Sequence, residues 1–273
     1  MHGYPYTDSV DIPLSSRKIP VRISGGGQPI LLLHGYPLDG RLWNRVVPLL
    51  SGKQLCIVPD LRGFGRSAEE TKSFSMAELA KDCIQLLDVL QIRQRILVCG
   101  LSMGGYVAMQ IAQLYPERVS CLVLTNTRAN ADDLAGAAIR RSIAQDALTQ
   151  GVAKTVLPML GKLLSIQTMA NEPEVVGLVR DMMLETRAST IAWAQIAMAG
   201  REDFRLKMRD WKMPTVCIAG AEDAITPPDV LAQMANVIPN SIFHAVANSS
   251  HLTPLECPEE FAKIVVESIP RLC

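Results

Sequence analysis

The sequence predicts an α/β fold with a mostly parallel central sheet, helices on both faces and an inserted block of helices. Two observations carry this prediction. Short, nearly continuous apolar segments recur along the chain and alternate with helical patterns, which is the order typical of a parallel sheet. One long interval, residues 127–211, breaks the alternation because it reads as helical throughout. At 273 residues the chain has room for one large α/β domain with such an insertion, or for two small domains.

The predicted strands are apolar, partly β-branched segments bounded by glycine, proline or polar residues. Two strands are predicted first, near Ser9–Leu14 and Lys18–Ser24, followed by a turn in the sequence SGGG. Six further segments share the pattern: 29–35, 54–60, 95–100, 120–126, 214–220 and 241–246. These six segments lack strict alternation of apolar and polar residues, which predicts strands that are covered on both faces.

The predicted helices outside the long interval are Arg41–Leu50, Ser75–Leu90, Met103–Leu114, Val230–Val237 and Glu259–Ile269. The interval 127–211 is rich in Ala, Leu and Met and follows directly after the C-terminal end of a predicted strand, where ligands bind in such sheets. We therefore expect residues 127–211 to form a helical cap (lid) on a core made of residues 1–126 and 212–273. The alternative is an ordinary helical layer.

Composition and charge exclude several classes of protein. The 27 basic and 27 acidic residues balance, so no net field attracts nucleic acid or an anionic membrane. No apolar run reaches the roughly 18 residues of a membrane helix, and the polar start MHGYPYTDSVDIPL lacks the apolar region of a secretory signal. Seven scattered cysteines without a CxxC pair are typical of reduced thiols rather than of disulfides or a zinc site. We expect a cytoplasmic protein without nucleic-acid or membrane partners.

The sequence Gly100-Leu101-Ser102-Met103-Gly104 lies where a predicted strand turns into a predicted helix. A serine in such a tight, strained turn projects its hydroxyl group, and glycines two residues away on either side let neighbouring elements approach closely. The alternative is a glycine-rich turn with an incidental serine. As a nucleophile, Ser102 would need a base to remove its proton and a third group to orient that base.

The base is sought among only four histidines. His2 is near the terminus, and His244 lies within a predicted strand. His34 ends a predicted strand, just before the loop that is expected to supply a backbone N–H group to the substrate oxygen. His251 lies on a loop beyond the C-terminal end of the last predicted strand. That position gives a base freedom of placement, so His251 is the predicted base.

The orienting acid is expected at the end of another strand. The segment 120–126 ends in Asn126 and offers no carboxylate, whereas the segment 214–220 is followed by Glu222 and Asp223. Asp223 is the predicted acid, and Glu222 is the reserve. The order Ser102, Asp223, His251 is the one that belongs to a strand–turn–helix nucleophile.

Backbone N–H groups must stabilise the negative charge that develops on the substrate oxygen. Met103, directly after the nucleophile, can supply one N–H group. The loop after segment 29–35 can supply the second from Tyr36, because Gly35 lets the chain turn there and Pro37 has no N–H group to donate.

Five motifs occur in order along the chain: LLLHGYP, PDLRGFGRS, GLSMGG, GAEDAITPP and SSHLTPLECP. With them the chain resembles, over essentially its whole length, small capped α/β-hydrolases such as carboxylesterases, 3-oxoadipate enol-lactonases and cofactor-free haloperoxidases. The resemblance implies a Ser–His–Asp triad of Ser102, His251 and Asp223, main-chain donors at Tyr36 and Met103, and no metal or organic cofactor. Haloalkane dehalogenases and epoxide hydrolases share this fold but have aspartate at the nucleophile position, so Ser102 argues against both.

The expected function is hydrolysis of a small or medium carboxylic ester or lactone through an acyl-enzyme, by a monomer or a small homo-oligomer. The alternatives are perhydrolysis (haloperoxidase activity) or carbon–carbon bond cleavage with the same triad, and a ligand-binding receptor on this scaffold. Four side chains of the inserted helices are candidates to line the substrate pocket, with plain core packing as the alternative: Met159, Met183, Trp193 and Met198.

Overall fold

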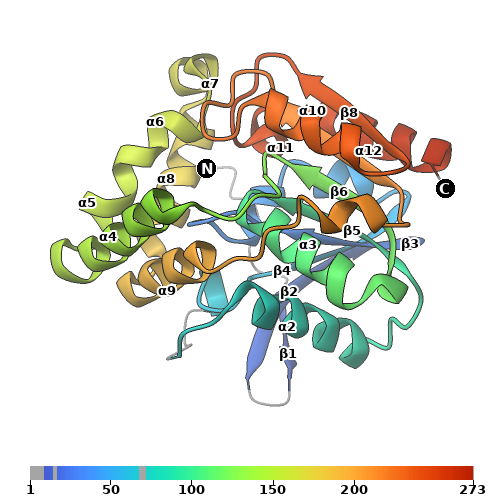
Figure 1. The fold of residues 1–273 in the computed structure, drawn as a ribbon, viewed down its shortest axis with the longest axis horizontal. Coiled ribbons are helices and arrows are strands. Elements are labelled where there is room, and N and C mark those ends of the chain that lie inside the picture. Colours follow the sequence, from blue (N-terminus) through green and yellow to red (C-terminus); the bar gives the residue numbers. More distant parts are fainter. Residues whose placement is uncertain (1–8, 15–16, 68–71, 273) are drawn as a thin grey trace.

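The computed structural model describes residues 9–14, 17–67 and 72–272, with the side chains of 269–272 excepted. Within these residues eight strands form one sheet in the order β1-β2-β4-β3-β5-β6-β7-β8 (Figure 1). The first two pairings, β1 with β2 and β2 with β4, are antiparallel, and all the others are parallel. The predicted mostly parallel α/β sheet is therefore confirmed. His2 and the last of the seven cysteines, Cys273, lie outside the described residues.

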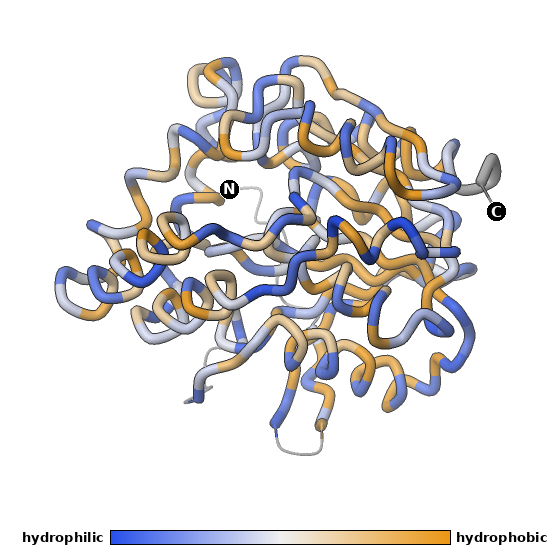
Figure 2. Tube along the Cα trace, viewed as in Figure 1, coloured by the Kyte–Doolittle hydropathy of each residue, from blue (hydrophilic) through white to orange (hydrophobic). Residues whose placement is uncertain are grey.

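The strand boundaries lie within one or two residues of the predicted segments. They are β1 Ser9–Pro13, β2 Lys18–Gly25, β3 Gln28–Leu33, β4 Gln54–Pro59, β5 Ile96–Leu101, β6 Val119–Thr125, β7 Thr215–Gly220 and β8 Ser241–Val246. The central strands β5 and β7 are buried along their whole length, as their continuous apolar sequences predict. Figure 2 shows hydrophobic residues concentrated in the middle of the molecule, where the sheet lies.

The helices beside the sheet are α1 Val47–Leu50, α2 Met76–Val89, α3 Met103–Leu114, α10 Pro228–Val237, α11 Thr253–Glu256 and α12 Pro258–Leu272. Ser75 caps α2 in a capping box with Glu78, whose side chain accepts a hydrogen bond from the Ser75 N–H group. Helix α2 packs against α3, and α1 packs against α12. Three 3₁₀ turns connect these elements: η2 Gly40–Trp43, η3 Gly65–Ser67 and η4 Pro116–Arg118.

The continuous helix predicted for Arg41–Leu50 is wrong. The structure has a 3₁₀ turn, η2 Gly40–Trp43, and then the four-residue α1. A continuous helix would need the N–H group of residue 48 to bond to the carbonyl of Asn44, and Pro48 has no N–H group. Proline is tolerated instead in the first turn of α1.

Residues 127–211, all of them described, contain helices and loops but no strand. Their helices, here called the inserted helices, are α4 Leu134–Gln150, α5 Val152–Val156, α6 Leu160–Leu163, α7 Ile166–Asn171, α8 Pro173–Glu185 and α9 Ala188–Ala199, with the 3₁₀ turns η5 Leu157–Met159 and η6 Lys207–Asp210. Helices α4–α9 gather at one end of the molecule, on the left in Figure 1, and α4 packs along α9. In the sequence, they are inserted between strands β6 and β7.

The six described cysteines form no disulfide, and five of them are buried. Cys56 lies in β4, and Cys99, Cys121 and Cys217 lie in the three neighbouring strands β5, β6 and β7. Among the described His, Cys, Asp and Glu side chains, no group of three or more is placed to hold a metal ion. In the same part of the chain, no helix combines the length and the apolar character needed to cross a membrane.

Candidate active site

Ser102 lies in the sharp turn between β5 and α3, with a φ of 55° and a ψ of −115°. Such a positive φ is strained for a residue with a side chain and costs about 1–3 kcal/mol. The flanking glycines make the turn possible. A Cβ atom on Gly100 would lie 2.2 Å from the Gly104 carbonyl oxygen, and one on Gly104 would lie 2.2 Å from the Leu33 carbonyl oxygen. The strained serine is thus held by backbone packing that only glycine permits.

His251 and Asp223 meet at 2.8 Å, measured from Nδ1 to Oδ2, and each residue is only 2% exposed. Because a carboxylate can only accept, the ring donates from Nδ1, and Nε2 is the basic nitrogen of the neutral imidazole. The other carboxylate oxygen of Asp223 accepts hydrogen bonds from the backbone N–H groups of Ile225, at 2.8 Å, and Thr226, at 2.9 Å. The adjacent Glu222 is exposed.

The pKa of Asp223 lies below its usual range. Burial by itself raises this pKa, but the hydrogen bond and charge of His251, the N–H group of Thr226 and the amide of Asn126 together outweigh burial and lower it. Asp223 is therefore ionised where it faces the imidazole, which suits a group that orients a base and stabilises its protonated form.

Asn126 is a site residue that the sequence analysis did not predict, since it was considered only as a strand end without a carboxylate. Its side-chain N–H₂ group donates to Asp223 Oδ2 at 2.9 Å and to the Ser250 carbonyl at 3.2 Å. Its Oδ1 accepts from the Thr253 hydroxyl at 2.9 Å. Asn126 thereby links the acid to the loop that carries His251. The only signal in the sequence is its polar character at the end of an apolar strand.

Glu256 is a second residue that the sequence analysis missed. One carboxylate oxygen accepts from the backbone N–H group of Ser250 at 2.7 Å, and the other accepts from the N–H group of Ser165 at 2.6 Å. Ser250 precedes His251, and Ser165 caps α7. This buried carboxylate therefore ties the histidine loop to the inserted helices. Nothing in the sequence indicates this role, because Glu256 lies just before the predicted C-terminal helix and looks like an ordinary polar residue of the connecting segment.

The loop after β3 passes directly against the nucleophile turn. A Cβ atom on Gly35 would lie 2.8 Å from Leu101 Cδ2 and 3.3 Å from Ser102 Cβ, so the absence of a side chain lets this loop approach the turn without displacing Leu101. Tyr36 follows, is buried and borders the cavity beside Ser102. Met103 is the first residue of α3, and the first N–H groups of a helix have no partner within it. The two predicted main-chain donors thus lie on the two segments that meet at Ser102.

His34 braces the loop that carries Gly35. Its Nε2 accepts from the Leu61 N–H group and its Nδ1 donates to the Gly35 carbonyl, each at 3.0 Å. The ring is completely buried, and this burial lowers the pKa of His34. Only the neutral ring can make both hydrogen bonds, because a protonated imidazole could still donate to Gly35 but could not accept from Leu61.

This arrangement predicts a pH dependence of stability. Since the folded-state pKa of His34 is below the unfolded value of about 6.5, the unfolded chain binds the proton first as the pH falls. The free energy of unfolding should therefore be highest above about pH 6.5 and fall below it. Urea unfolding of wild type and His34→Gln between pH 8 and pH 5 tests this. The variant should be less stable at neutral pH but lose less stability on acidification, and equal slopes would contradict the assignment.

A cavity of about 280 Å³ joins these groups. Ser102, His251 and Tyr36 border it from the sheet side, and α4, α9 and the segment around α6 border it from the other side. Of the predicted pocket residues, Met159 and Met198 border the cavity. Met183 and Trp193 are not among the described residues that line it; Met183 is fully buried in the core, and Trp193 packs against the core.

Helix geometry explains why Trp193 is displaced from the cavity. On α9 the residues that border the cavity are Gln195 and Met198, which are three positions apart and share one face. Trp193 is two positions before Gln195, about 200° around the helix, so its side chain points away from that face.

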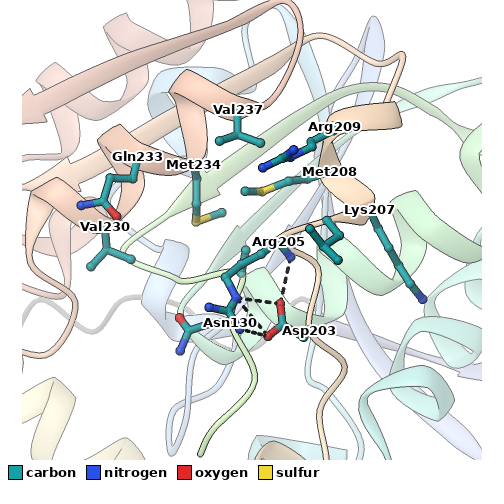
Figure 3. Close-up of a pocket in the computed structure, with 12 residues that line it drawn as sticks. Asn130, Asp203, Arg205, Lys207, Met208, Arg209, Val230, Gln233, Met234 and Val237 are labelled. Carbon is teal, nitrogen blue, oxygen red and sulfur yellow. Dashed lines mark hydrogen bonds and ion pairs between the residues drawn. The ribbon is translucent and has the colours of Figure 1, made fainter.

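A larger cavity, of about 780 Å³, lies between α10 and the segment around η6 (Figure 3). None of the described residues that line it also borders the cavity at Ser102. Asp203 and Arg205 on its wall pair with each other. The smaller cavity is the candidate active site, because Ser102 and His251 both open onto it.

The fold and the strand–turn–helix serine define an α/β-hydrolase. The family model of the alpha/beta hydrolase fold matches residues 28–258, so the chain belongs to that family, and the predicted family is confirmed. The chain is 34% identical to a thermophilic esterase from Thermogutta terrifontis, whose malate-bound structure aligns with a TM-score of 0.91 over 97% of this chain and 98% of that chain.

Two further relatives act on esters or lactones according to their names. The chain is 26% identical to the enol-lactonase from Burkholderia xenovorans LB400. The two structures align with a TM-score of 0.88 over 96% of this chain and 100% of that chain. It is 27% identical to the pimeloyl-acyl-carrier-protein methyl ester esterase of Yersinia enterocolitica, covering 89% of this chain and 93% of the relative. The chain is thus a hydrolase of the α/β fold with esterase and lactonase relatives.

Proposed function

We propose that this protein is a serine hydrolase that cleaves a small or medium carboxylic ester or lactone through an acyl-enzyme. The observation that carries the proposal is the buried 2.8 Å contact between His251 Nδ1 and Asp223 Oδ2, beside a strained serine that borders the same cavity as His251. Esterases and an enol-lactonase among the relatives support the class of reaction.

In the first half of the proposed reaction, His251 Nε2 takes the proton from the Ser102 hydroxyl as the serine oxygen attacks the substrate carbonyl. Asp223 keeps the Nδ1 proton in place and stabilises the imidazolium that forms. The N–H groups of Tyr36 and Met103 donate to the oxyanion of the tetrahedral intermediate. His251 then gives its proton to the leaving alcohol, and the acyl-enzyme remains.

In the second half, His251 removes a proton from water, and the resulting hydroxide attacks the acyl carbonyl. His251 then returns the proton to Ser102 Oγ as the bond between the acyl carbon and Oγ breaks, which releases the acid and restores the serine hydroxyl. These steps need no metal or organic cofactor. We assign residues 127–211 the role of a cap over a core of residues 1–126 and 212–273. Side chains of α4, α9 and the segment around α6 border the cavity, which supports this division.

Labelling with a fluorophosphonate tests the proposal at the nucleophile. The probe should modify one serine per chain, Ser102, and abolish turnover of p-nitrophenyl acetate, because only a serine activated by a base reacts readily with it. Ser102→Ala should be neither labelled nor active, while Ser142→Ala on the exposed side of α4 should behave as wild type. Labelling at another serine, or full turnover by the labelled protein, would refute the proposal.

A further inference from the structure

The cavity at Ser102 has a local excess of positive charge. Arg128, Arg140 and Lys162 border it, and no Asp or Glu is among the described residues that line it. The chain as a whole has equal numbers of basic and acidic residues, 27 of each, so this excess is not a property of the whole molecule. The lining of the cavity is therefore more positively charged than the chain as a whole.

Arg140 is only partly neutralised. It forms an ion pair with Asp132, and Asp132 is shared with Arg201, which it meets at 2.7 Å. One carboxylate facing two guanidinium groups leaves one positive charge in excess. Arg140 also donates to Gln195 Oε1 at 3.1 Å, and this second contact holds the guanidinium group at the cavity wall without adding negative charge.

Arg128 has neutral partners. One of its terminal nitrogens donates to the carbonyl of Ile225 and, at 3.5 Å, lies near the Thr226 hydroxyl. Among the described residues it forms no ion pair with a carboxylate, although its side chain is half-buried. A guanidinium group has five N–H donors in a planar fork that matches a carboxylate, so Arg128 retains donors for an anion in the cavity.

Lys162 adds a charge from the opposite wall. It belongs to α6, is exposed and borders the same cavity. Arg128 follows β6, so cations of the sheet side and of the inserted helices face one small space. An anion bound between them would be partly removed from water, where charge-assisted hydrogen bonds are strong.

We propose that Arg128, together with Lys162 and the excess charge at Arg140, forms a subsite for a carboxylate on the substrate. The preferred substrate is then an ester or lactone that carries a free carboxylate group, such as a half-ester of a dicarboxylic acid. This inference rests on the proposed function, because it names the substrate class of the same site.

Matched ester pairs test the carboxylate subsite. Monomethyl adipate and methyl hexanoate differ only in a terminal carboxylate on the acyl side, and γ-acetoxybutanoate and butyl acetate differ in the same way on the alcohol side. Wild type should prefer the anionic member of one pair by at least about tenfold in kcat/KM, since hydrogen bonds to charged groups are the strong ones. The pair that shows the preference identifies the side of the substrate that the subsite binds.

Variants assign the preference to the cavity. Arg128→Gln should reduce it toward equality, and Arg128→Lys should retain part of it. Arg141→Gln is the matched control, because Arg141 neighbours Arg140 on α4 but is exposed and is not among the residues that line the cavity. Arg141→Gln should keep the wild-type preference. A wild type without preference, or an Arg128→Gln variant that loses activity equally on both esters of a pair, would overturn the proposal.

Binding to the Ser102→Ala variant separates the subsite from the reaction. Calorimetry with both ester pairs should show the anionic member of one pair binding at least about tenfold more tightly than its neutral counterpart, with the difference lost in Ser102→Ala/Arg128→Gln. If wild type hydrolyses no ester but this binding difference is found, the proposed function fails and the subsite stands. If esters are hydrolysed but the binding difference is absent, the subsite fails and the proposed function stands.

Discussion

Asp223→Asn should lower kcat for ester hydrolysis by roughly 10⁴-fold, as in the serine-protease triad, while the fold is retained. Oδ1 of Asp223 accepts from two backbone N–H groups, so the amide oxygen of an asparagine would take that position. The amide N–H₂ group would then face His251 Nδ1 and the side-chain N–H₂ group of Asn126. His251 could no longer donate from Nδ1, and the neutral ring would carry its proton on Nε2, where it cannot act as the base.

Glu222→Gln is the matched control for this prediction. Glu222 is the neighbouring carboxylate, but its side chain is exposed, whereas that of Asp223 is buried against the imidazole. Neutralising Glu222 should change kcat little, because charges in water are strongly screened. Steady-state kinetics on p-nitrophenyl acetate measure both variants. A larger loss in Glu222→Gln than in Asp223→Asn would reverse the assignment of the acid.

The strands were predictable because a continuous apolar sequence indicates a strand that is buried on both faces. β5 and β7 are continuous apolar runs and are buried throughout, and each run stands between turn residues that mark its ends. The error at residues 41–50 has a different origin. There the apolar residues do follow a helical pattern, but Pro48 lacks one N–H group, and this local chemistry outweighs periodicity.

Residues at the site were predictable to the extent that they follow the ends of parallel strands. That rule led to Ser102, Asp223 and His251, which the structure brings to one edge of the sheet. Hydrogen-bond partners could not be found in this way. Asn126 is 97 residues from Asp223, and its role depends on the register of two neighbouring strands rather than on any local pattern. Glu256 depends in the same way on where α7 meets the histidine loop.

His251→Gln should lower kcat by roughly 10⁶-fold, because loss of the base removes the action of the whole triad. Glutamine has no group that can take a proton from Ser102 and return it to the leaving alcohol. The circular dichroism spectrum should not change, since the neighbouring backbone is held independently: the Ser250 N–H group donates to Glu256, and the Ser250 carbonyl accepts from Asn126.

The pH profile of wild-type kcat/KM gives the same assignment a second test. One proton on the base blocks the reaction, so the acid limb should fall about tenfold per pH unit. Protonation of Asp223 does not account for this limb, because the pKa of that carboxyl is held below its usual range. His244→Gln is the control, since His244 lies in β8 and contacts Ser268 rather than the cavity. Its profile should match wild type, and an acid limb that disappears in His244→Gln would show that another histidine is the base.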